Sequence, residues 1–377
     1  MDTSKWALDI AEKIHQKELS VVERNNNRIP YTTDQGKFDD WSEDGKICWW
    51  TNGFWAGMLW QLYHAFGDTS FMTCAKNIES KLDKNLMNYM GMDHDSGFKW
   101  LLTAGASYEL TKSDASKNRF MLAAGNLAGR FNLNANLIRA WNDSGNGDTS
   151  GWAIIDCMMN LPLLYKASEL TCDPRFTQIA MAHADRAMEV FIREDGSSHH
   201  IITFDPNTGA ILKPLGGQGM DEGSSWTRGQ SWALYGFSLS YRHTKKESYL
   251  TTAIKVADYI LSQIPVSNRI PVDYKQPKDC SWEDDTAAAI TASGLLLLSE
   301  ELLSTDASRS KKYKDTAIGL LQTLATESCN WDNSVDHFLE NCSAAYHDEK
   351  HNFAIIYGDY YFIEAILRLC NKEIFLW

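Results

Sequence analysis

The sequence predicts an all-α fold, a closed (α/α)6 barrel in which six helical hairpins form one domain over residues 1–377. Three observations lead to this prediction. Apolar residues recur at helical spacing in twelve segments, few segments show the alternation of a β-strand, and the connections alternate between short and long. Because helices joined by short turns pack as antiparallel pairs, twelve such segments predict six pairs around one axis.

A repeated pattern marks where five of these helices begin. An aromatic residue is followed four positions later by Ala, directly after a short polar turn, which places both side chains on the same helical face. The five pairs are Phe71/Ala75, Phe120/Ala124, Phe176/Ala180, Tyr249/Ala253 and Tyr313/Ala317. The twelve predicted helices are residues 3–19, 51–66, 69–86, 98–111, 115–131, 151–171, 174–192, 226–243, 247–263, 283–303, 309–327 and 356–370.

The connections differ in length and composition. Turns from even-numbered to odd-numbered helices are short, as at Gly67-Asp68, whereas the segments that enter the even-numbered helices are long and rich in Trp, Gly, His and Asp. One of them, residues 199–205 followed by a turn at 206–209, is the best candidate for a β-hairpin. Since loops on a rigid scaffold carry most binding residues, we expect the functional site at the long-loop end.

Composition argues against several classes of partner. The chain has 36 basic and 49 acidic residues and a formal net charge of -13, which repels nucleic acid and anionic membrane surfaces. No window is long and apolar enough for a membrane span. The 14 Trp exceed what a core of this size needs, and planar indole faces are what sugar rings stack on.

The cysteines indicate a reducing compartment. All 8 stand singly with no C-x-x-C pair, and Cys157 and Cys370 lie inside apolar helical patterns, as reduced and packed thiols do. Residues 1–13 lack the apolar stretch of a signal peptide. We therefore expect a bacterial cytoplasmic location and no structural zinc, with a signal peptide trimmed ahead of Met1 left open.

One carboxylate stands out from its surroundings. Asp156 lies in the run from Gly151 to Tyr165, which otherwise has the pattern of a buried helix. An ionised carboxylate there is costly unless it is paired, and burial raises its pKa, so Asp156 is a candidate proton donor. The alternative is that Asp156 only caps or hydrogen-bonds a neighbouring loop.

The long loops hold the side chains of a carbohydrate site. They carry most of the Trp residues outside apolar helical faces, several acids and Arg228. Indoles pack on ring faces, acids transfer protons and an arginine binds an anionic group. Asp95 and Asp156 form the obvious pair of carboxylates for glycosidic chemistry.

The loop residues also allow other functions. A metal site made of His94, Asp95, His199 and His200 is the competing interpretation. Because these residues include no His pair at i,i+4 and the sequence has no His-Glu-x-x-His motif, we expect no metal and no cofactor. The adjacent pair Asp284-Asp285 is expected to cap the tenth helix rather than to act in catalysis.

Five motifs, in order along the chain, resemble one known family. They are Trp50-Thr-Asn-Gly-Phe-Trp55, His94-Asp95 followed by Ser96-Gly-Phe98, Ile154-Ile-Asp-Cys157 with Asn160-Leu-Pro162, Ser225-Trp-Thr-Arg-Gly-Gln230, and Gly358-Asp-Tyr-Tyr361. The family that they resemble is glycoside hydrolase family 88, the unsaturated glucuronyl hydrolases. The resemblance runs from about Trp49 to the last helix, and the six-hairpin barrel of that family agrees with the helix count reached independently.

The resemblance implies an unusual hydrolysis. The expected substrates are oligosaccharides left by polysaccharide lyases, with a 4,5-unsaturated glucuronic acid at the non-reducing end, here of glycosaminoglycan type. An acid protonates C4 of the C4=C5 enol ether, water adds at C5, and the resulting hemiketal falls apart. Such chemistry needs a carboxyl that is protonated near neutral pH and can also take a proton from water.

The resemblance also implies roles for individual residues. Asp156 falls on the acid/base position, and Asp95 falls on that of a second essential aspartate, which hydrogen-bonds sugar hydroxyls and influences Asp156. Substrate-site positions fall on His94, His200, Gln218 and Arg228, and aromatic-wall positions fall on Trp50, Trp141, Trp226 and Trp232. One departure concerns Gly217, where members of the family carry His or Arg, so that a side chain near the substrate is missing here.

Three alternatives stay open at the level of the sequence. One is an unsaturated rhamnogalacturonyl hydrolase acting on pectin fragments, and another is a sugar epimerase or isomerase on the same barrel. The third is a sugar-binding protein with an inactive site, which the presence of both aspartates disfavours. The expected partner is the saccharide alone, and the expected state is a monomer or a weak oligomer.

Overall fold

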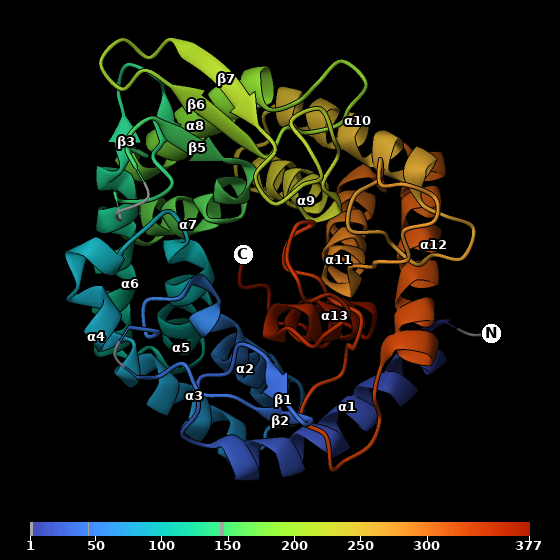
Figure 1. The fold of residues 1–377 in the computed structure, drawn as a ribbon. Coiled ribbons are helices and arrows are strands. Elements are labelled where there is room, and N and C mark those ends of the chain that lie inside the picture. The colour runs from blue at the N-terminus through green and yellow to red at the C-terminus, as the bar shows by residue number, and fades with distance from the viewer. Residues whose placement is uncertain (1–2, 44, 144–146) are drawn as a thin grey trace.

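Two concentric rings of helices surround a central axis in the computed structural model, which describes residues 3–43, 45–143 and 147–377 (Figure 1). The inner ring consists of α2 (Phe54–Phe66), α5 (Ala106–Thr111), α7 (Leu161–Thr171), α9 (Thr227–Thr244), α11 (Asp285–Leu302) and α13 (Ile356–Leu369). The outer ring consists of α1 (Thr3–Asn25), α3 (Thr69–Lys81), α6 (Asp114–Gly129), α8 (Arg175–Val190), α10 (Glu247–Gln263) and α12 (Ala307–Thr323). The predicted (α/α)6 barrel is confirmed.

The two rings differ in their sequence pattern because they differ in burial. Every residue of α13 from Ile356 to Arg368 is buried, as expected of a helix that is surrounded by protein on all sides. An outer helix such as α3 buries one face only, at Phe71, Cys74, Ala75 and Ile78 among others. All five predicted aromatic–Ala pairs are buried and lie on outer helices, so this repeat marks the face that packs on the inner ring.

The short turns between inner and outer helices share one backbone device. The residue after the inner helix takes a left-handed conformation, with φ of +86° at Gly67, +55° at Lys112, +55° at Cys172 and +52° at Lys245. A left-handed residue ends the helix and lets its last carbonyls bond to the chain that turns back. The helix pairs are therefore closed by local geometry, with only one of these four positions using glycine.

Shorter helical pieces extend several of these elements. They are η1 (Trp50–Gly53), α4 (Asp83–Leu86), η2 (Tyr89–Gly91), the π-helix η3 (Gly97–Gly105), η4 (Ile155–Met159) and the π-turn η5 (Leu324–Ser328). One boundary differs from the prediction of a helix over residues 151–171. Strand β5 (Trp152–Ile154) and the 3-10 turn η4 occupy its first half, and α7 begins only at Leu161 with Pro162 in its first turn. Asp156 therefore lies in a tight turn rather than mid-helix.

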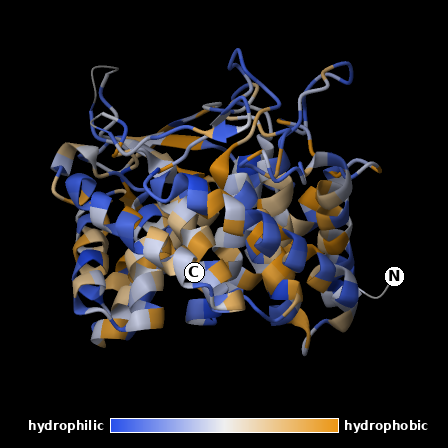
Figure 2. Ribbon diagram, turned by 90° about the horizontal axis from the view of Figure 1, so that it is seen from below, coloured by the Kyte–Doolittle hydropathy of each residue, from blue (hydrophilic) through white to orange (hydrophobic). Residues whose placement is uncertain are grey.

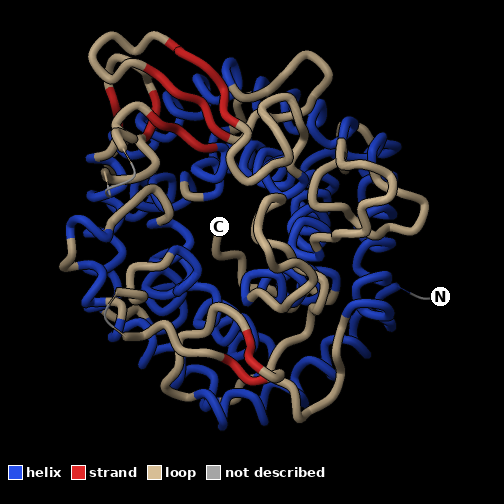
Figure 3. Tube along the Cα trace, viewed as in Figure 1, coloured by secondary structure: helices blue, strands red, loops and turns tan. Residues whose placement is uncertain are grey.

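The long connections gather at one end of the barrel and form a layer above it (Figure 2). This layer contains a three-stranded antiparallel sheet in the order β5–β6–β7, with β6 at Ile201–Phe204 and β7 at Ile211–Leu215 (Figure 3). The predicted hairpin is confirmed as β6–β7. Two further two-stranded pairs were not predicted, namely β1 (Thr33–Asp34) with β2 (Lys37–Phe38) and β3 (Phe131–Asn132) with β4 (Leu137–Ile138).

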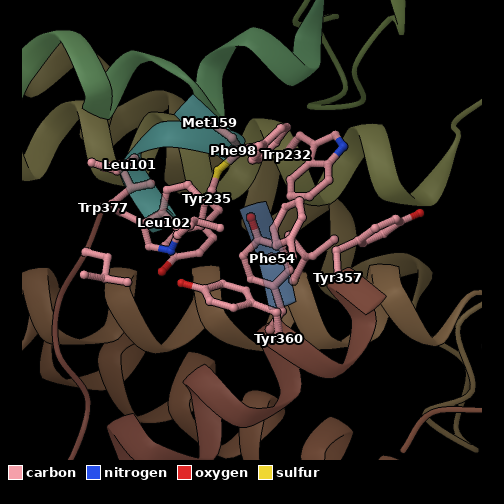
Figure 4. Close-up of a cluster of buried hydrophobic side chains, with 14 of the residues drawn as sticks. Phe54, Phe98, Leu101, Leu102, Met159, Trp232, Tyr235, Tyr357, Tyr360 and Trp377 are labelled. Atoms are coloured by element: carbon pink, nitrogen blue, oxygen red, sulfur yellow. The ribbon is translucent and has the colours of Figure 1, made fainter. Parts of the chain in front are cut away.

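The centre of the barrel is filled by aromatic side chains. Figure 4 shows Phe54, Phe98, Trp232, Tyr360 and Trp377 packed together, and Trp377 stacks on Tyr361 with 5.9 Å between ring centroids. The interior is therefore a core rather than a channel. None of the described helices is long and apolar enough to cross a membrane.

Candidate active site

A cavity of about 660 Å³ opens among the long loops. Eight of the ten predicted site residues line it: Trp50, His94, Asp95, Trp141, Asp156, His200, Gln218 and Arg228. The other lining residues are Tyr31, Cys48, Trp49, Asp93, Trp152, Ile154, Ile201, Gly217, Ala344, Ala345, Asp348 and Tyr357. Its floor is the top of the aromatic core, because Trp50 contacts Phe98 and Tyr357 at centroid distances of 5.4 and 4.8 Å.

Backbone hydrogen bonds join the loops that carry the polar residues. The amide of His94 donates to the carbonyl of Ala140 at 3.0 Å, and the amide of Ala140 donates to the carbonyl of Trp152 at 2.8 Å. Beyond the end of β5, the amide of Ile155 donates to the carbonyl of His200 at 3.0 Å. These bonds hold four segments that are distant in sequence beside each other. Asp156 follows the end of β5 and His200 precedes the start of β6, so the two residues lie side by side.

Asp156 has the environment of a carboxyl that keeps its proton. Its side chain is 15% exposed, and within the described residues its Oδ2 has no hydrogen-bond partner. Burial raises the pKa of Asp156 to about 7, while the positive charge of Arg228 opposes this shift. At neutral pH this carboxyl can therefore both give and take a proton.

His200 is held as a neutral ring beside Asp156. Its Nδ1 accepts a hydrogen bond from the amide of Gln218 at 2.9 Å, which leaves the proton of a neutral ring on Nε2. That Nε2 lies 3.7 Å from Oδ2 of Asp156. Burial lowers the pKa of His200 to about 3, so the ring stays uncharged at neutral pH and faces Asp156 as a dipole rather than as a cation.

Asp95 lies in a second, more acidic part of the pocket. Burial, followed by the charges of Asp93 and Asp156, raises the pKa of Asp95 well above its ordinary value. His94 places Nε2 at 3.5 Å from Oδ1 of Asp95, and burial lowers the pKa of His94 to about 3. The amide of Asn160 donates to the same Oδ1 at 3.2 Å.

Arg228 is anchored by the protein. Its guanidinium is buried, pairs with Oδ2 of Asp284 at 2.7 Å, and donates to the carbonyls of Ser343, at 2.6 Å, and Ala344. Asp284 also caps α11, since its side chain accepts from the amide of Thr286, as predicted. The arginine therefore fastens the loop around residue 344 to the barrel while it faces the pocket.

The comparisons with known proteins agree with this geometry. The sequence profile of Glycosyl Hydrolase Family 88 matches residues 20–240. An unsaturated glucuronyl hydrolase of Bacillus sp. (strain GL1) is 35% identical over 328 residues, covering 85% of this chain and 86% of the relative. An unsaturated chondroitin disaccharide hydrolase of Streptococcus pneumoniae is 32% identical over 347 residues, covering 87% of this chain and 83% of the relative.

This chain belongs to glycosyl hydrolase family 88. It is therefore a glycoside hydrolase, as the motifs predicted. A crystal structure of the unsaturated glucuronyl hydrolase from Bacillus sp. GL1, described as responsible for glycosaminoglycan degradation, superposes with a TM-score of 0.89. That match has 32% sequence identity and covers 97% of this chain and 96% of the other.

Two of the four predicted aromatic walls lie elsewhere in this family 88 barrel. Trp226 is buried behind the pocket, where its ring contacts His200 at a centroid distance of 4.3 Å and Arg228 at 4.4 Å. Trp232 is fully buried in the core and packs on Phe98 at 5.2 Å. Trp226 can support the polar residues, whereas Trp232 has no face in the pocket.

The pocket contains residues that sequence reasoning missed. Trp49 and Trp152 add to its walls, and Trp152 packs on Trp141 at a centroid distance of 5.9 Å. Asp93 adds a carboxylate whose Oδ1 accepts from the amide of Asp95 at 3.0 Å. Trp49 and Asp93 are next to residues of the family motifs, and this adjacency in sequence could have identified them. Tyr31 and Asp348 lie in no motif, so the sequence around them gives no sign that they line the pocket.

Gly217 has a structural reason to be glycine in this member of family 88. Its φ is +59°, and a Cβ there would lie 2.0 Å from Nδ1 of His200. A side chain would therefore displace the histidine ring that accepts from Gln218. The position of His200 therefore requires glycine at residue 217, in addition to any space that the missing side chain leaves for substrate.

Potential metal ligands are dispersed. Across residues 3–43, 45–143 and 147–377, no group of three or more His, Cys, Asp or Glu side chains is arranged to hold a metal ion. His199, named in the metal interpretation, does not line the pocket, and its Nδ1 instead accepts a hydrogen bond from Arg193 at 3.0 Å.

Proposed function

We propose that this chain removes 4,5-unsaturated glucuronic acid from the non-reducing end of lyase-generated, glycosaminoglycan-type oligosaccharides by hydrating the C4=C5 enol ether. The observation that carries the proposal is Asp156, an acid in the pocket whose pKa is raised by burial to about 7. The names of relatives that match most of the chain, unsaturated glucuronyl hydrolase and unsaturated chondroitin disaccharide hydrolase, support the same substrate class.

The reaction assigns one proton cycle to Asp156. Its carboxyl gives a proton to C4, and the resulting carboxylate takes a proton from the water that adds its oxygen to C5. The C5 hemiketal then opens the ring, and the hemiacetal left at C1 releases the hydroxyl of the next sugar. The acid is restored at the end, and one water is consumed.

The other pocket residues bind and orient in this proposal. Asp95 acts as a carboxylate that accepts hydrogen bonds from sugar hydroxyls, with neutral His94 beside it. Arg228 and Gln218 orient the uronate and the water. The ring stacks between walls that include Trp50 and Trp141, and the latter remains 38% exposed at the mouth.

The direct test is the absorbance of the unsaturated uronate during incubation with lyase-generated chondroitin, hyaluronan and heparin disaccharides. Loss of absorbance is expected, because hydration destroys the C4=C5 chromophore. Turnover of pectin-derived fragments alone would contradict the proposed substrate and favour a rhamnogalacturonyl hydrolase. No absorbance loss with any of these substrates would contradict the reaction itself.

Activity should fall in alkaline solution. The acid form of Asp156 is half populated at a pH of about 7 and decreases above it, so kcat/KM is expected to drop about tenfold per pH unit in that range. The measurement is kcat/KM for one disaccharide from pH 5 to pH 9. A profile that stays flat to pH 9 would contradict a proton donor with this pKa.

Unsulfated substrates should be preferred. Among the described residues that line the pocket, Arg228 is the one cation, and it is already paired with Asp284, whereas Asp93, Asp95, Asp156 and Asp348 carry carboxyl groups. A sulfate near these groups meets repulsion without a basic partner. We expect a higher kcat/KM for unsulfated than for sulfated chondroitin disaccharide. Asp348→Asn should narrow this difference, and equal rates in the parent enzyme would contradict the electrostatic argument.

We further propose that residues 1–377 act as one domain, as a monomer or a weak oligomer, in a bacterial cytoplasm on imported disaccharides. All 8 cysteines are free thiols, which supports a reducing compartment. Cell fractionation tests the location, and light scattering tests the oligomeric state. Recovery of the protein in an oxidising compartment would overturn the cytoplasmic location.

A further inference from the structure

A buried side-chain amide connects the carboxyl group of Asp95 to the backbone of the turn that carries Asp156. The Nδ2 of Asn160 donates to Oδ1 of Asp95 at 3.2 Å and to the backbone carbonyl of Asp156 at 3.3 Å. Its Oδ1 accepts from the amide of Phe98 at 2.9 Å, which fixes the orientation of the side-chain amide. The Asn160 side chain is fully buried, so water does not compete for these bonds.

The local sequence leaves this side chain free for that task. Asn160 occupies the N-cap position of α7, where Asn usually caps amides of the first turn, but here its side chain makes no cap hydrogen bond. Pro162 has no amide to be capped, and the amide of Leu163 bonds to the backbone carbonyl of Asn160 at 3.2 Å instead.

Close packing keeps the two segments in register. A Cβ at Gly97 would lie 2.7 Å from both Cα and Oδ1 of Asn160, so the start of η3 and the end of η4 meet without room for a side chain. Asn160 therefore sits at the junction of the segment that carries Asp95 and the turn that carries Asp156.

The two carboxyl groups differ in their hydrogen bonds. Asp95 accepts from the side-chain amide of Asn160 through Oδ1, whereas Asp156 has a hydrogen bond from its own backbone amide and its Oδ2 has no partner among the described residues. A donor stabilises the ionised form of the carboxyl that it contacts. The bond from Asn160 opposes the rise that burial, Asp93 and Asp156 cause in the pKa of Asp95, and it therefore favours the charged form of Asp95.

Asp95 is surrounded by titratable and charged groups. The titratable or charged groups that face it are Asp93, His94, Lys99, Asp156 and Cys157. Lys99 is buried and its Nζ lies 3.4 Å from Oδ1 of Asp93, so its charge is engaged there, and His94 is neutral. Asn160 is thus a fixed neutral donor to Asp95 within an acidic cluster.

We infer that Asn160 is a positioning residue that stabilises the carboxylate of Asp95 and holds the turn of Asp156, so that Asp95 is the charged group and Asp156 the acid. This inference rests on the proposed function. It adds a residue that selects which of two neighbouring carboxyls is the acid. No contact of Asn160 with substrate is required.

The test compares Asn160→Ala and the near-isosteric Asn160→Asp with the parent enzyme. Without the amide donor, Asp95 holds a proton to higher pH, so the acidic limb of the kcat/KM profile, where Asp95 ionises, should move upward by about one pH unit. The maximal kcat should fall by a factor on the order of 10 to 100, because the proton is misplaced, while KM changes much less. Asn160→Asp should shift the profile further, since it adds a like charge.

Asn25 provides a matched control. It is also buried, and its Nδ2 donates to a carboxylate, Oδ2 of Asp336 at 3.0 Å, and to the backbone carbonyl of Val21 at 2.9 Å. Asn25→Ala should lower the melting temperature without moving the pH profile. The inference is overturned if the Asn160 variants lose activity only in proportion to stability, with the parent profile. A parent enzyme that consumes no alkene would instead refute the proposed function.

Discussion

Asp156→Asn is expected to lower kcat/KM by a factor on the order of 10² to 10⁴ while the fold is preserved. The amide cannot give its proton to C4 or take one from water. The substitution is nearly isosteric, and Oδ2 of Asp156 has no hydrogen-bond partner among the described residues, so no internal bond is lost there. The measurement is alkene consumption by the variant, together with its thermal unfolding and its binding of unreacted disaccharide.

Asp285→Asn makes the same chemical change outside the pocket and serves as the matched control. Burial raises the pKa of Asp285 to about 7 as well, but this carboxylate accepts from Ser328 at 3.1 Å and from the amide of Asn341 at 2.9 Å. Asp285→Asn should therefore lose stability by about 1–3 kcal/mol, because an amide cannot accept both bonds equally, and should retain turnover. Near-normal turnover by Asp156→Asn would remove the assignment of the acid.

Arg228→Ala is expected to lower the free energy of unfolding by about 3–5 kcal/mol, in addition to raising KM. The loss arises because Asp284, fully buried, would be left charged without its partner at 2.7 Å. The carbonyls of Ser343 and Ala344 would also lose their donor, which loosens the loop beside the pocket. Urea unfolding and substrate titration measure the two effects separately.

A double variant separates the structural role of Arg228 from substrate binding. Asp284→Asn in the Arg228→Ala background removes the stranded charge and should recover much of the stability but none of the affinity. As a surface comparison, Arg242 pairs with Glu301 at 2.6 Å with 27% of its side chain exposed, and Arg242→Ala should cost less than about 1 kcal/mol. Equal losses at Arg228 and Arg242 would contradict the importance of the buried pair.

Features with a local cause were predictable from the sequence. Helical periodicity and the aromatic–Ala pairs led to the twelve helices and their pairing, because both patterns describe the face that each helix buries. The raised pKa of Asp156 was also foreseeable, since an apolar neighbourhood along the chain indicates burial. The motifs led to the family, which the comparisons confirm.

Strand β5 was missed for a physical reason. Residues Trp152 to Ile154 are apolar and adjoin α7, so their pattern fits a buried helix as well as a strand. The pairing partner that makes them a strand, β6, lies about fifty residues further along the chain, with Ile154 opposite Ile201. The same pairing brings His200 beside Asp156, and no local signal contains it.

The sequence by itself determined the helical barrel, the end that carries the site and the acids and aromatics available to it, because these follow from periodicity, turn residues and side-chain chemistry. Only the tertiary structure decided which of them meet. It buried Trp232 in the core, paired Arg228 with Asp284, brought Asp348 to the pocket and set Asn160 between Asp95 and Asp156. Some of these contacts join segments more than a hundred residues apart, such as Arg228 with Ala344. They depend on how whole helices pack.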